Sequence, residues 1–388
     1  MTGIFEAPLA TDELRPTHIE VDLAALVENY RVIAAHVAPA QVMPILKANA
    51  YGHGLVPVAR ALEAAGVPSV GVAYLEEGLR LRQCGVRCPV LVLGGIVGDQ
   101  IPLFLANDLS LTASSVDKLR AVEACAEAQG IRAKVHLKID TGMERIGIHW
   151  YSAETLLEAS LSCRHLDIEG IFTHFANADR ADLAHARLQL ERFLEVLRFY
   201  ERRSLPTPLR HAANSGAILQ LSESHLDLVR PGVLFYGAAP SSELALGLAV
   251  KPAMRWISKV VFFKVVKAGN PVSYGSDFAP TEMTRVVTLP VGYGDGYVRR
   301  LSGRAQVLLG GRRHPVVGRV CMDQSMVDIG LHSAWNGDQA VLLGRQGNQA
   351  ITIEELAAWA DTIPHEMFAL INTRVPRIYF EGDRQRVP

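Results

Sequence analysis

The sequence predicts an α/β protein with an N-terminal (β/α)8 TIM-type barrel, followed by a mostly antiparallel β-strand C-terminal domain. Short, continuously apolar segments alternate with amphipathic helical patterns over the first two thirds of the chain. Such segments are typical of parallel strands buried on both faces. Eight of these units suit a closed barrel, with an open doubly wound sheet as the structural alternative. Closely spaced strand patterns with few helices begin after about residue 245, which favours a second domain.

The expected barrel domain covers residues 15–245. Its candidate strands, in chain order, are 43–46, 69–74, 89–95, 110–114, 134–140, 167–175, 209–215 and 228–237. The clearest helix between them is 184–203, where apolar residues recur at helical spacing. These residues are Leu190, Phe193, Leu194 and Leu197.

The expected C-terminal β domain covers residues 246–388, and strand 17–22 is expected to join it. Its candidate strands are 256–266, 285–291, 304–310, 313–320, 325–330 and 339–344. One short helix is expected at 352–361, because Thr352 can cap it and Glu355 follows three positions later.

Composition limits the function classes. The 388 residues include 39 basic and 40 acidic side chains, a balance that does not favour nucleic acid or an anionic membrane as partner. No apolar segment is long enough to span a bilayer. Residues 1–16 lack the pattern of a secretory signal, and five scattered cysteines do not form a disulfide framework. We therefore expect a cytoplasmic protein. Cys84 and Cys88 resemble half of a metal site, but no second pair lies nearby, so no metal is expected.

Reactive side chains gather where the barrel strands end, which is where barrel enzymes carry their active sites. Basic side chains at one mouth suit an anionic, electron-withdrawing ligand. The basic residues and the polar residues next to them at this mouth are Lys47, Lys138, Arg145, His174, His211, Asn214, Ser215 and Arg230. Without further context, each residue has a simpler interpretation. Lys47 would be a solvated loop lysine, Asp140 a loop acid and His53 a structural residue. No metal-binding spacing links His174 with His211.

The segment around Lys47, KANAYGHG, resembles the pyridoxal-phosphate attachment motif of the alanine racemase family. The resemblance recurs in order along the chain. It is carried by HLKIDTGMERIGI, THFANAD, HAANSGA, RPGVLFYG, VSYGSDF, TLPVGYGDGYVRR, VGRVCMDQSMVDIG and RVPRIY. It implies a pyridoxal-5'-phosphate enzyme that interconverts L- and D-alanine and supplies D-alanine for peptidoglycan.

The resemblance also implies how the cofactor is held. Lys47 would carry it covalently, Tyr51 and Ser215 would contact its phosphate, and Arg230 would face its ring nitrogen with His211 behind. Arginine keeps its proton, so it would donate a hydrogen bond to that nitrogen without protonating it. The implied cofactor-binding residues are Lys47, Tyr51, His174, His211, Asn214, Ser215, Arg230, Gly232, Val233 and His365.

Two opposed bases are implied for catalysis: Lys47, and Tyr274 from the partner subunit of a homodimer. Arg145 and the backbone amide of Met322 would hold the substrate carboxylate, and Tyr293 and Asp323 would line the site. The entrance residues would be Asp179, Arg299 and Arg319. Lys138 is either a barrel lysine paired with an acid or, as the resemblance implies, a carbamate that holds Arg145.

His365 departs from the resemblance, because the family carries a tyrosine at this position. Histidine is shorter and changes charge near neutral pH, which favours a broader alanine/serine racemase as an alternative. A pyridoxal-phosphate homeostasis protein is the non-enzymatic alternative, but that class lacks a β domain with VSYG and CMDQ. A barrel-type decarboxylase is a third alternative. That class places an acid where this chain has Arg230.

Overall fold

A computed structural model describes residues 15–382 and 385–387. The N-terminal stretch in which we expect no secretory signal lies outside these residues except for Arg15 and Pro16. The chain divides into two compact units. The barrel unit is Leu26–Lys251, and the β unit comprises the residues up to Ala25 together with those from Pro252 onward. The boundary lies six residues beyond the predicted one, which followed residue 245.

Eight parallel strands close into a ring within residues 26–251, all of which are described. Their cyclic order is β2 (Gln41–Val42), β3 (Val70–Val72), β4 (Val90–Val92), β5 (Leu111–Ala113), β6 (Ala133–Asp140), β8 (Leu166–Phe172), β9 (Leu209–His211) and β10 (Leu228–Val229). Isolated bridges join Ile45 to Gly71 and Leu91 to Ser110, which completes the circle. Closure confirms the (β/α)8 prediction and excludes an open sheet.

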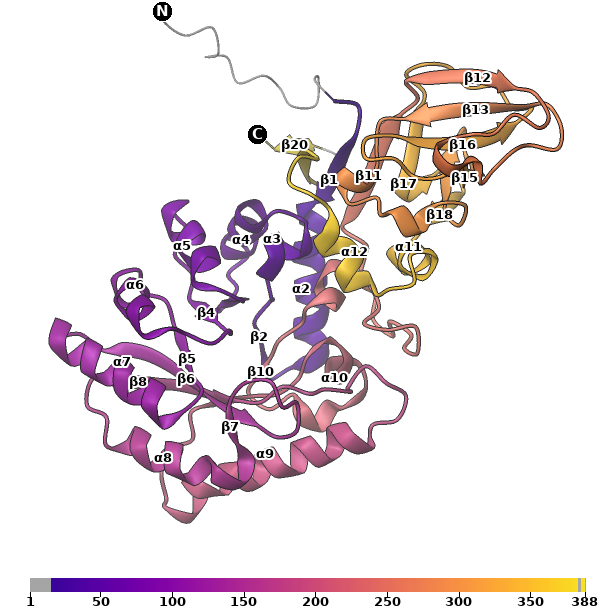
Figure 1. Ribbon diagram of the computed structural model, residues 1–388. Helices are drawn as coiled ribbons and strands as arrows, with labels where there is room; N and C mark the ends of the chain where they lie inside the picture. The colour runs from indigo at the N-terminus through magenta and orange to yellow at the C-terminus, as the bar shows by residue number, and fades with distance from the viewer. Residues whose placement is uncertain (1–14, 383–384, 388) are drawn as a thin grey trace, which may run out of the picture. The chain divides into compact units, whose positions relative to one another are not determined.

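Helices surround these strands (Figure 1). They are α2 (Leu23–Val37), α3 (Lys47–Tyr51), α4 (Leu55–Ala64), α5 (Leu75–Gln83), α6 (Ile101–Ala106), α7 (Val116–Gln129), α8 (Ala153–Leu161), α9 (Ala184–Arg202) and α10 (Ser215–Gln220). Short pieces complete the unit: η1 (Gly98–Gln100), β7 (Ile148–His149), η2 (Trp150–Ser152), η3 (Ser222–Ser224) and η4 (Val233–Tyr236).

Local sequence explains where these elements begin and end. In α7 the Ser115 side chain accepts from the Lys118 amide at 3.2 Å, and Gly130 ends the helix in the left-handed conformation. In α9, Leu190, Phe193 and Leu197 are buried as expected. Leu194 is 41 % exposed, so its assignment to the buried face was wrong.

The β unit contains a mostly antiparallel sheet in the order β12-β13-β16-β15-β14-β17-β11-β1-β19-β20, with β18 paired to β17. The strands are β1 (His18–Asp22), β11 (Met254–Lys259), β12 (Phe262–Val266), β13 (Thr284–Leu289), β14 (Gln306–Leu309), β15 (Arg312–Val317), β16 (Ser325–Gly330), β17 (Gln339–Gln346), β18 (Gln349–Ile351), β19 (Arg377–Glu381) and β20 (Gln385–Val387). β1 pairs antiparallel with β11 and parallel with β19.

The remaining elements of the β unit are η5 (Tyr274–Ser276), η6 (Tyr293–Asp295), η7 (Arg299–Leu301), α11 (Ile353–Trp359) and α12 (Pro364–Leu370). The Thr352–Glu355 capping box begins α11 as expected, with the Thr352 hydroxyl accepting from the Glu355 amide at 3.2 Å. The sequence analysis did not include α12.

Several strand predictions were too long, and one covered two strands. The segment 228–237 is strand only to Val229, because Pro231 has no amide hydrogen for the ladder and the chain then turns into η4. The segment 209–215 leaves the sheet at His211, and Asn214 caps α10 by accepting from the Ala217 amide at 3.1 Å. The segment 256–266 is two strands, β11 and β12.

Candidate active site

Lys47 begins a left-handed helical turn at the barrel mouth. The φ angles of Ala48, Asn49, Ala50 and Tyr51 are 53°, 55°, 53° and 49°, although none of these residues is glycine. This conformation costs about 1–2 kcal/mol per residue for L-amino acids, so the surrounding structure must hold it.

Polar contacts from neighbouring segments hold the turn. The carboxylate of Glu77, at the start of α5, accepts from the amides of Ala48 at 2.7 Å and Ala73 at 2.8 Å. The side-chain oxygen Oδ1 of Asn49 accepts from the Leu55 amide at 2.8 Å and so ties the turn to α4. These contacts fix the backbone from which the Lys47 side chain extends.

An aromatic cluster supports the turn from inside the barrel unit. The Tyr236 ring lies 4.9 Å from Tyr51 and 4.4 Å from His53, and its hydroxyl donates to the Ile45 carbonyl at 2.9 Å. His53 is fully buried, and its Nδ1 donates to the Tyr51 carbonyl at 2.9 Å, which fits a structural role. Burial raises the pKa of Tyr51, so its hydroxyl stays protonated and can donate.

The predicted phosphate contacts form a small cradle. Ser215 Oγ accepts from the amides of Gly232 at 2.9 Å and Leu234 at 3.3 Å. A Cβ atom at Gly232 would lie only 2.7 Å from the Tyr51 hydroxyl and 3.7 Å from Ser215 Oγ. Glycine therefore keeps open a space beside the Tyr51 and Ser215 hydroxyls, two groups that can donate to a phosphate. The residues present fit the phosphate of the expected cofactor.

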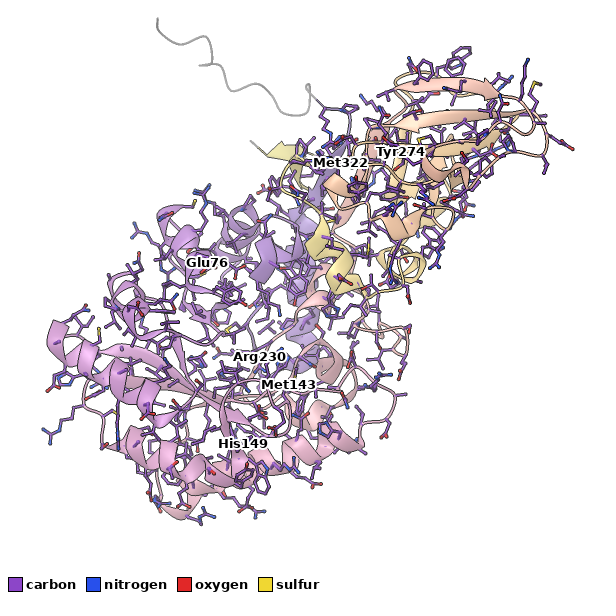
Figure 2. The ribbon with its side chains drawn as sticks, in the orientation of Figure 1. Glu76, Met143, His149, Arg230, Tyr274 and Met322 are labelled. Carbon is purple, nitrogen blue, oxygen red and sulfur yellow. The ribbon has the colours of Figure 1, made fainter. Side chains whose placement is uncertain are left out.

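Arg230, labelled in Figure 2, is the centre of a buried basic cluster. It donates to His211 Nδ1 at 2.8 Å, to the Thr173 carbonyl at 2.7 Å and to the Ala212 carbonyl at 3.0 Å. Burial lowers the pKa of Arg230 to about 9, which leaves it charged near neutral pH. Burial and the Arg230 charge also hold the pKa values of His174 and His211 well below the usual value, so both rings are neutral.

The pKa values of the two lysines of the mouth are both lowered. Lys138 is 3 % exposed, and burial together with the charge of Arg230 lowers its pKa to about 7. For Lys47, burial of the amine and then the Arg145 charge lower the pKa, while Glu77 opposes them. Asp140 accepts from the amides of three residues of its own loop, Gly142, Met143 and Arg145, as expected for a loop acid.

In the β unit, the loop that carries Tyr274 is fixed against Arg319. Tyr274 is 70 % exposed, and the Ser273 hydroxyl donates to the Arg319 carbonyl at 2.6 Å. A Cβ atom at Gly275 would lie 2.5 Å from Arg319 Cζ. Arg319 also pairs with Asp277, and this hydrogen bond lowers the pKa of the carboxyl.

Neighbouring loops bring further predicted residues together. The amides of Tyr293 and Gly294 donate to the carbonyls of Cys321 and Met322, each at 2.9 Å. Arg374 donates to Asp323 at 2.9 Å. Within the β unit, Tyr293, Met322 and Asp323 thus lie on adjoining loops, with Tyr274 and Met322 labelled in Figure 2.

Three predicted residues lie on other elements. Arg299 begins η7, His365 lies in α12, and Asp179 follows β8, where its carbonyl accepts from the Ser241 hydroxyl. Sequence reasoning missed Glu77 and Arg374. Glu77 lies in the first turn of α5, where acidic residues are common, and Arg374 begins the RVPRIY motif of the resemblance but was given no role.

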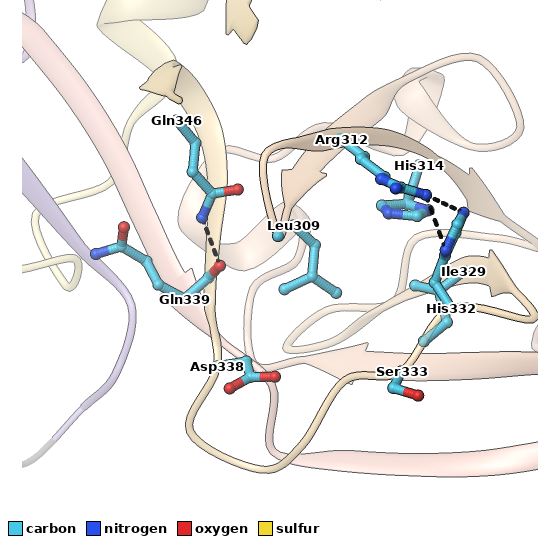
Figure 3. A pocket seen from close by; sticks show the side chains of 10 residues that line it. Leu309, Arg312, His314, Ile329, His332, Ser333, Asp338, Gln339 and Gln346 are labelled. Carbon is cyan, nitrogen blue, oxygen red and sulfur yellow. Dashed lines mark hydrogen bonds between the residues drawn. The ribbon is translucent and has the colours of Figure 1, made fainter. Parts of the chain in front are cut away.

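A pocket of about 370 Å³ in the β unit is separate from these groups. Figure 3 shows its lining side chains, with the Arg312 guanidinium 3.1 Å from both ring nitrogens of His332. None of the predicted site residues lines it. Among the residues that the structure describes, no three potential metal-binding side chains gather and no helix is long and apolar enough to cross a membrane.

Comparisons with known proteins cover both units. Residues 21–240 match the alanine racemase N-terminal domain and residues 253–379 match the alanine racemase C-terminal domain. The alanine racemase of Carboxydothermus hydrogenoformans is 44 % identical over 94 % of this chain and 100 % of its own length.

Solved structures that resemble this chain are also alanine racemases. An alanine racemase from Bacillus anthracis with bound L-Ala-P has a TM-score of 0.90 at 34 % identity, covering 98 % of each chain. One from Bartonella henselae with covalently bound pyridoxal phosphate has a TM-score of 0.84 at 29 % identity, covering 94 % of this chain and 99 % of that one.

The closed barrel carries the turn that begins at Lys47 and the cradle described above, and a β domain follows it. This arrangement defines a class of barrel proteins that hold a phosphorylated cofactor. Within that class, the matches over both units are decisive. The chain belongs to the alanine racemase family, which depends on pyridoxal phosphate, and the resemblance found in the sequence is confirmed.

Proposed function

We propose that this chain is a pyridoxal-phosphate-dependent alanine racemase that interconverts L- and D-alanine in the cytoplasm and supplies D-alanine for peptidoglycan. The observation that carries the proposal is the family match over both units, with Lys47 on a rigid turn at the mouth of the barrel. The cofactor site belongs to domain 15–245, and the second base to domain 246–388.

The cofactor's phosphate would be held by the Tyr51 and Ser215 hydroxyls and the amides near Gly232 and Val233. Arg230 would donate a hydrogen bond to its ring nitrogen, with His174 beside the ring. Asn214 contributes by capping α10 next to Ser215. When bound, pyridoxal phosphate withdraws electrons from the α-carbon of an amino acid and so makes its α-proton removable.

Two groups of this chain move the proton. The Lys47 amine would act on one face of the substrate and the Tyr274 hydroxyl on the other. One removes the α-proton and the other delivers a proton to the opposite face, and their roles exchange in the reverse reaction. The lowered pKa of Lys47 favours this, because only the neutral amine accepts a proton.

The site would be shared between two subunits of a homodimer. Arg145 from the barrel and the Met322 amide from the partner's β domain would hold the substrate carboxylate, and Tyr293 and Asp323 would line the site. Asp179, Arg299 and Arg319 would flank the entrance. The 70 % exposure of Tyr274 on the isolated chain supports its contribution to another subunit.

A direct assay separates the proposed function from its alternatives. L-alanine is incubated with the purified holoenzyme, and D-alanine and carbon dioxide are both measured. D-alanine without carbon dioxide supports the racemase. Carbon dioxide release indicates a decarboxylase, and cofactor absorbance with neither product indicates a homeostasis protein.

Lys138 is expected to carry a carbamate. Its neutral amine would form an N–C bond to carbon dioxide and release one proton, giving an anion able to bind Arg145 bidentately. Because the pKa of Lys138 is about 7, the reactive amine becomes scarce below that pH, and occupancy is expected to be higher at pH 8 than at pH 6.

Carbon-13 NMR of the holoenzyme in labelled bicarbonate measures this occupancy. The carbamate signal is expected to disappear in Lys138→Gln and to persist in Lys251→Gln, which alters an exposed lysine paired with Glu28. An equal signal in both variants would show that Lys138 is not the modified residue.

The presence of His365 favours a broader substrate range that includes serine. His365→Tyr adds bulk at this position and is expected to lower the ratio of kcat/KM for serine to that for alanine by about tenfold. The ratio is measured with both substrates on each protein. A constant ratio would remove His365 as a determinant of specificity.

A further inference from the structure

A single chain of polar contacts runs through the barrel from Arg230. Arg230 Nη1 lies 2.8 Å from His211 Nδ1, and His211 Nε2 lies 2.9 Å from His136 Nδ1. His136 Nε2 lies 3.6 Å from Glu169 Oε2, which also accepts from the Ser110 hydroxyl at 2.7 Å. The chain links the ends or interiors of β10, β9, β6, β8 and β5.

The contacts allow one arrangement of hydrogens. A guanidinium only donates, so His211 Nδ1 accepts from Arg230 and the hydrogen of this neutral ring lies on Nε2. That hydrogen is donated to His136 Nδ1, which places the hydrogen of a neutral His136 on its own Nε2, toward Glu169. Every donor therefore points from Arg230 toward the Glu169 carboxylate.

The charges at the two ends, a guanidinium and a carboxylate, match this direction of donation. In the described part of the chain, Arg230 contacts neutral acceptors only: two carbonyls and the rings of His174 and His211. A buried guanidinium needs a compensating negative group. The chain reaches one at Glu169, where burial opposes ionisation but the Ser110 hydrogen bond and the nearby His136 keep the pKa of the carboxyl below its usual value.

The backbone makes room for this chain. A Cβ atom at Gly170, the residue after Glu169, would lie 2.3 Å from His136 Nδ1 and 2.6 Å from its Cε1. Any side chain at Gly170 would displace the ring that connects His211 to Glu169. His136 and His211 are 7 % and 0 % exposed, so bulk water does not compete for the contact between the two rings, whereas the Glu169 side chain is 32 % exposed.

We propose that Glu169 is a positioning residue for racemisation, acting through His136 and His211 to fix the orientation of Arg230 and supply its counter-charge. This inference rests on the proposed function, because it assumes that Arg230 faces the cofactor ring. Glu169 itself touches neither substrate nor cofactor.

Glu169→Gln tests the proposal with a nearly isosteric side chain. The amide lacks the charge and can also donate to His136, so the hydrogens of both rings are no longer fixed. We expect mixed tautomers at His136 and His211 and a kcat for L-alanine about tenfold lower with little change in KM. Glu169→Asp keeps the charge and is expected to recover a large part of the loss.

Nitrogen-15 NMR of histidine-labelled, full-length holoenzyme reports the tautomers, and the racemisation assay reports kcat and KM. Glu123→Gln is the matched control, since Glu123 pairs with His165 at 3.2 Å outside this chain of contacts, and it is expected to match wild type in both readouts.

The possible outcomes are distinct. Altered tautomers with reduced kcat support the proposal. Unchanged tautomers, or an unchanged kcat, in Glu169→Gln overturn it, since the effect would then not pass through the histidines or not reach the reaction. A wild-type protein without racemase activity would instead refute the proposed function, while the NMR readout would still test the chain of contacts.

Discussion

Lys47→Ala is expected to lower kcat for alanine racemisation by about 10³-fold or more. Under the proposed function, the substitution would remove both the covalent attachment point of the cofactor and one of the two proton-transfer groups. The measurements are D-alanine formation from L-alanine and the visible absorbance of the bound cofactor, which is expected to change as well.

Lys251→Ala is the control, because it removes an exposed lysine whose ion pair with Glu28 contributes little to stability. It is expected to keep the wild-type rate. Substantial activity in Lys47→Ala would mean that another amine carries the cofactor, and Lys138 would be the first residue to examine.

Tyr274→Phe is expected to lower kcat by about 10²–10⁴-fold while leaving cofactor absorbance unchanged. Phenylalanine keeps the ring but has no proton to deliver to the face opposite Lys47. Both reaction directions need that group, so both rates are expected to fall. A variant that racemises at the wild-type rate would show that the second base is a different residue.

Mixed dimers test whether Tyr274 comes from the partner subunit. A dimer of one Lys47→Ala and one Tyr274→Phe subunit keeps one site with Lys47 and Tyr274 both intact, provided the two come from different chains. Random co-assembly of the two inactive variants is then expected to restore about a quarter of wild-type activity. No recovery would place both residues of a site on the same chain.

The sequence was sufficient for the architecture, because hydrophobic patterning reports burial. β6 was recognised from a segment in which Val135, Leu137 and Ile139 alternate with polar residues, and α11 from its capping box. Element ends were harder. The strand around Arg230 stops early for a local reason, Pro231, whereas Leu194 is exposed although its spacing fits the buried stripe.

The site was accessible to sequence reasoning only where its residues lie in short motifs. Lys47 and Arg230 could be named, but the left-handed turn after Lys47 could not, because alanine, asparagine and tyrosine disfavour it and Glu77, far along the chain, stabilises it. His136 and Glu169 were missed because their pairing depends on the neighbouring register of two strands.

The seam between β2 and β3 has a consequence for motion. Only a short run of backbone hydrogen bonds crosses it, including Leu46 to Gly71 at 2.7 Å and Gly71 to Pro44 at 2.9 Å. Local opening costs least where few such bonds must break. Local opening of the barrel wall at this seam would therefore move Lys47 with it, whereas the longer β6–β8 ladder would remain closed.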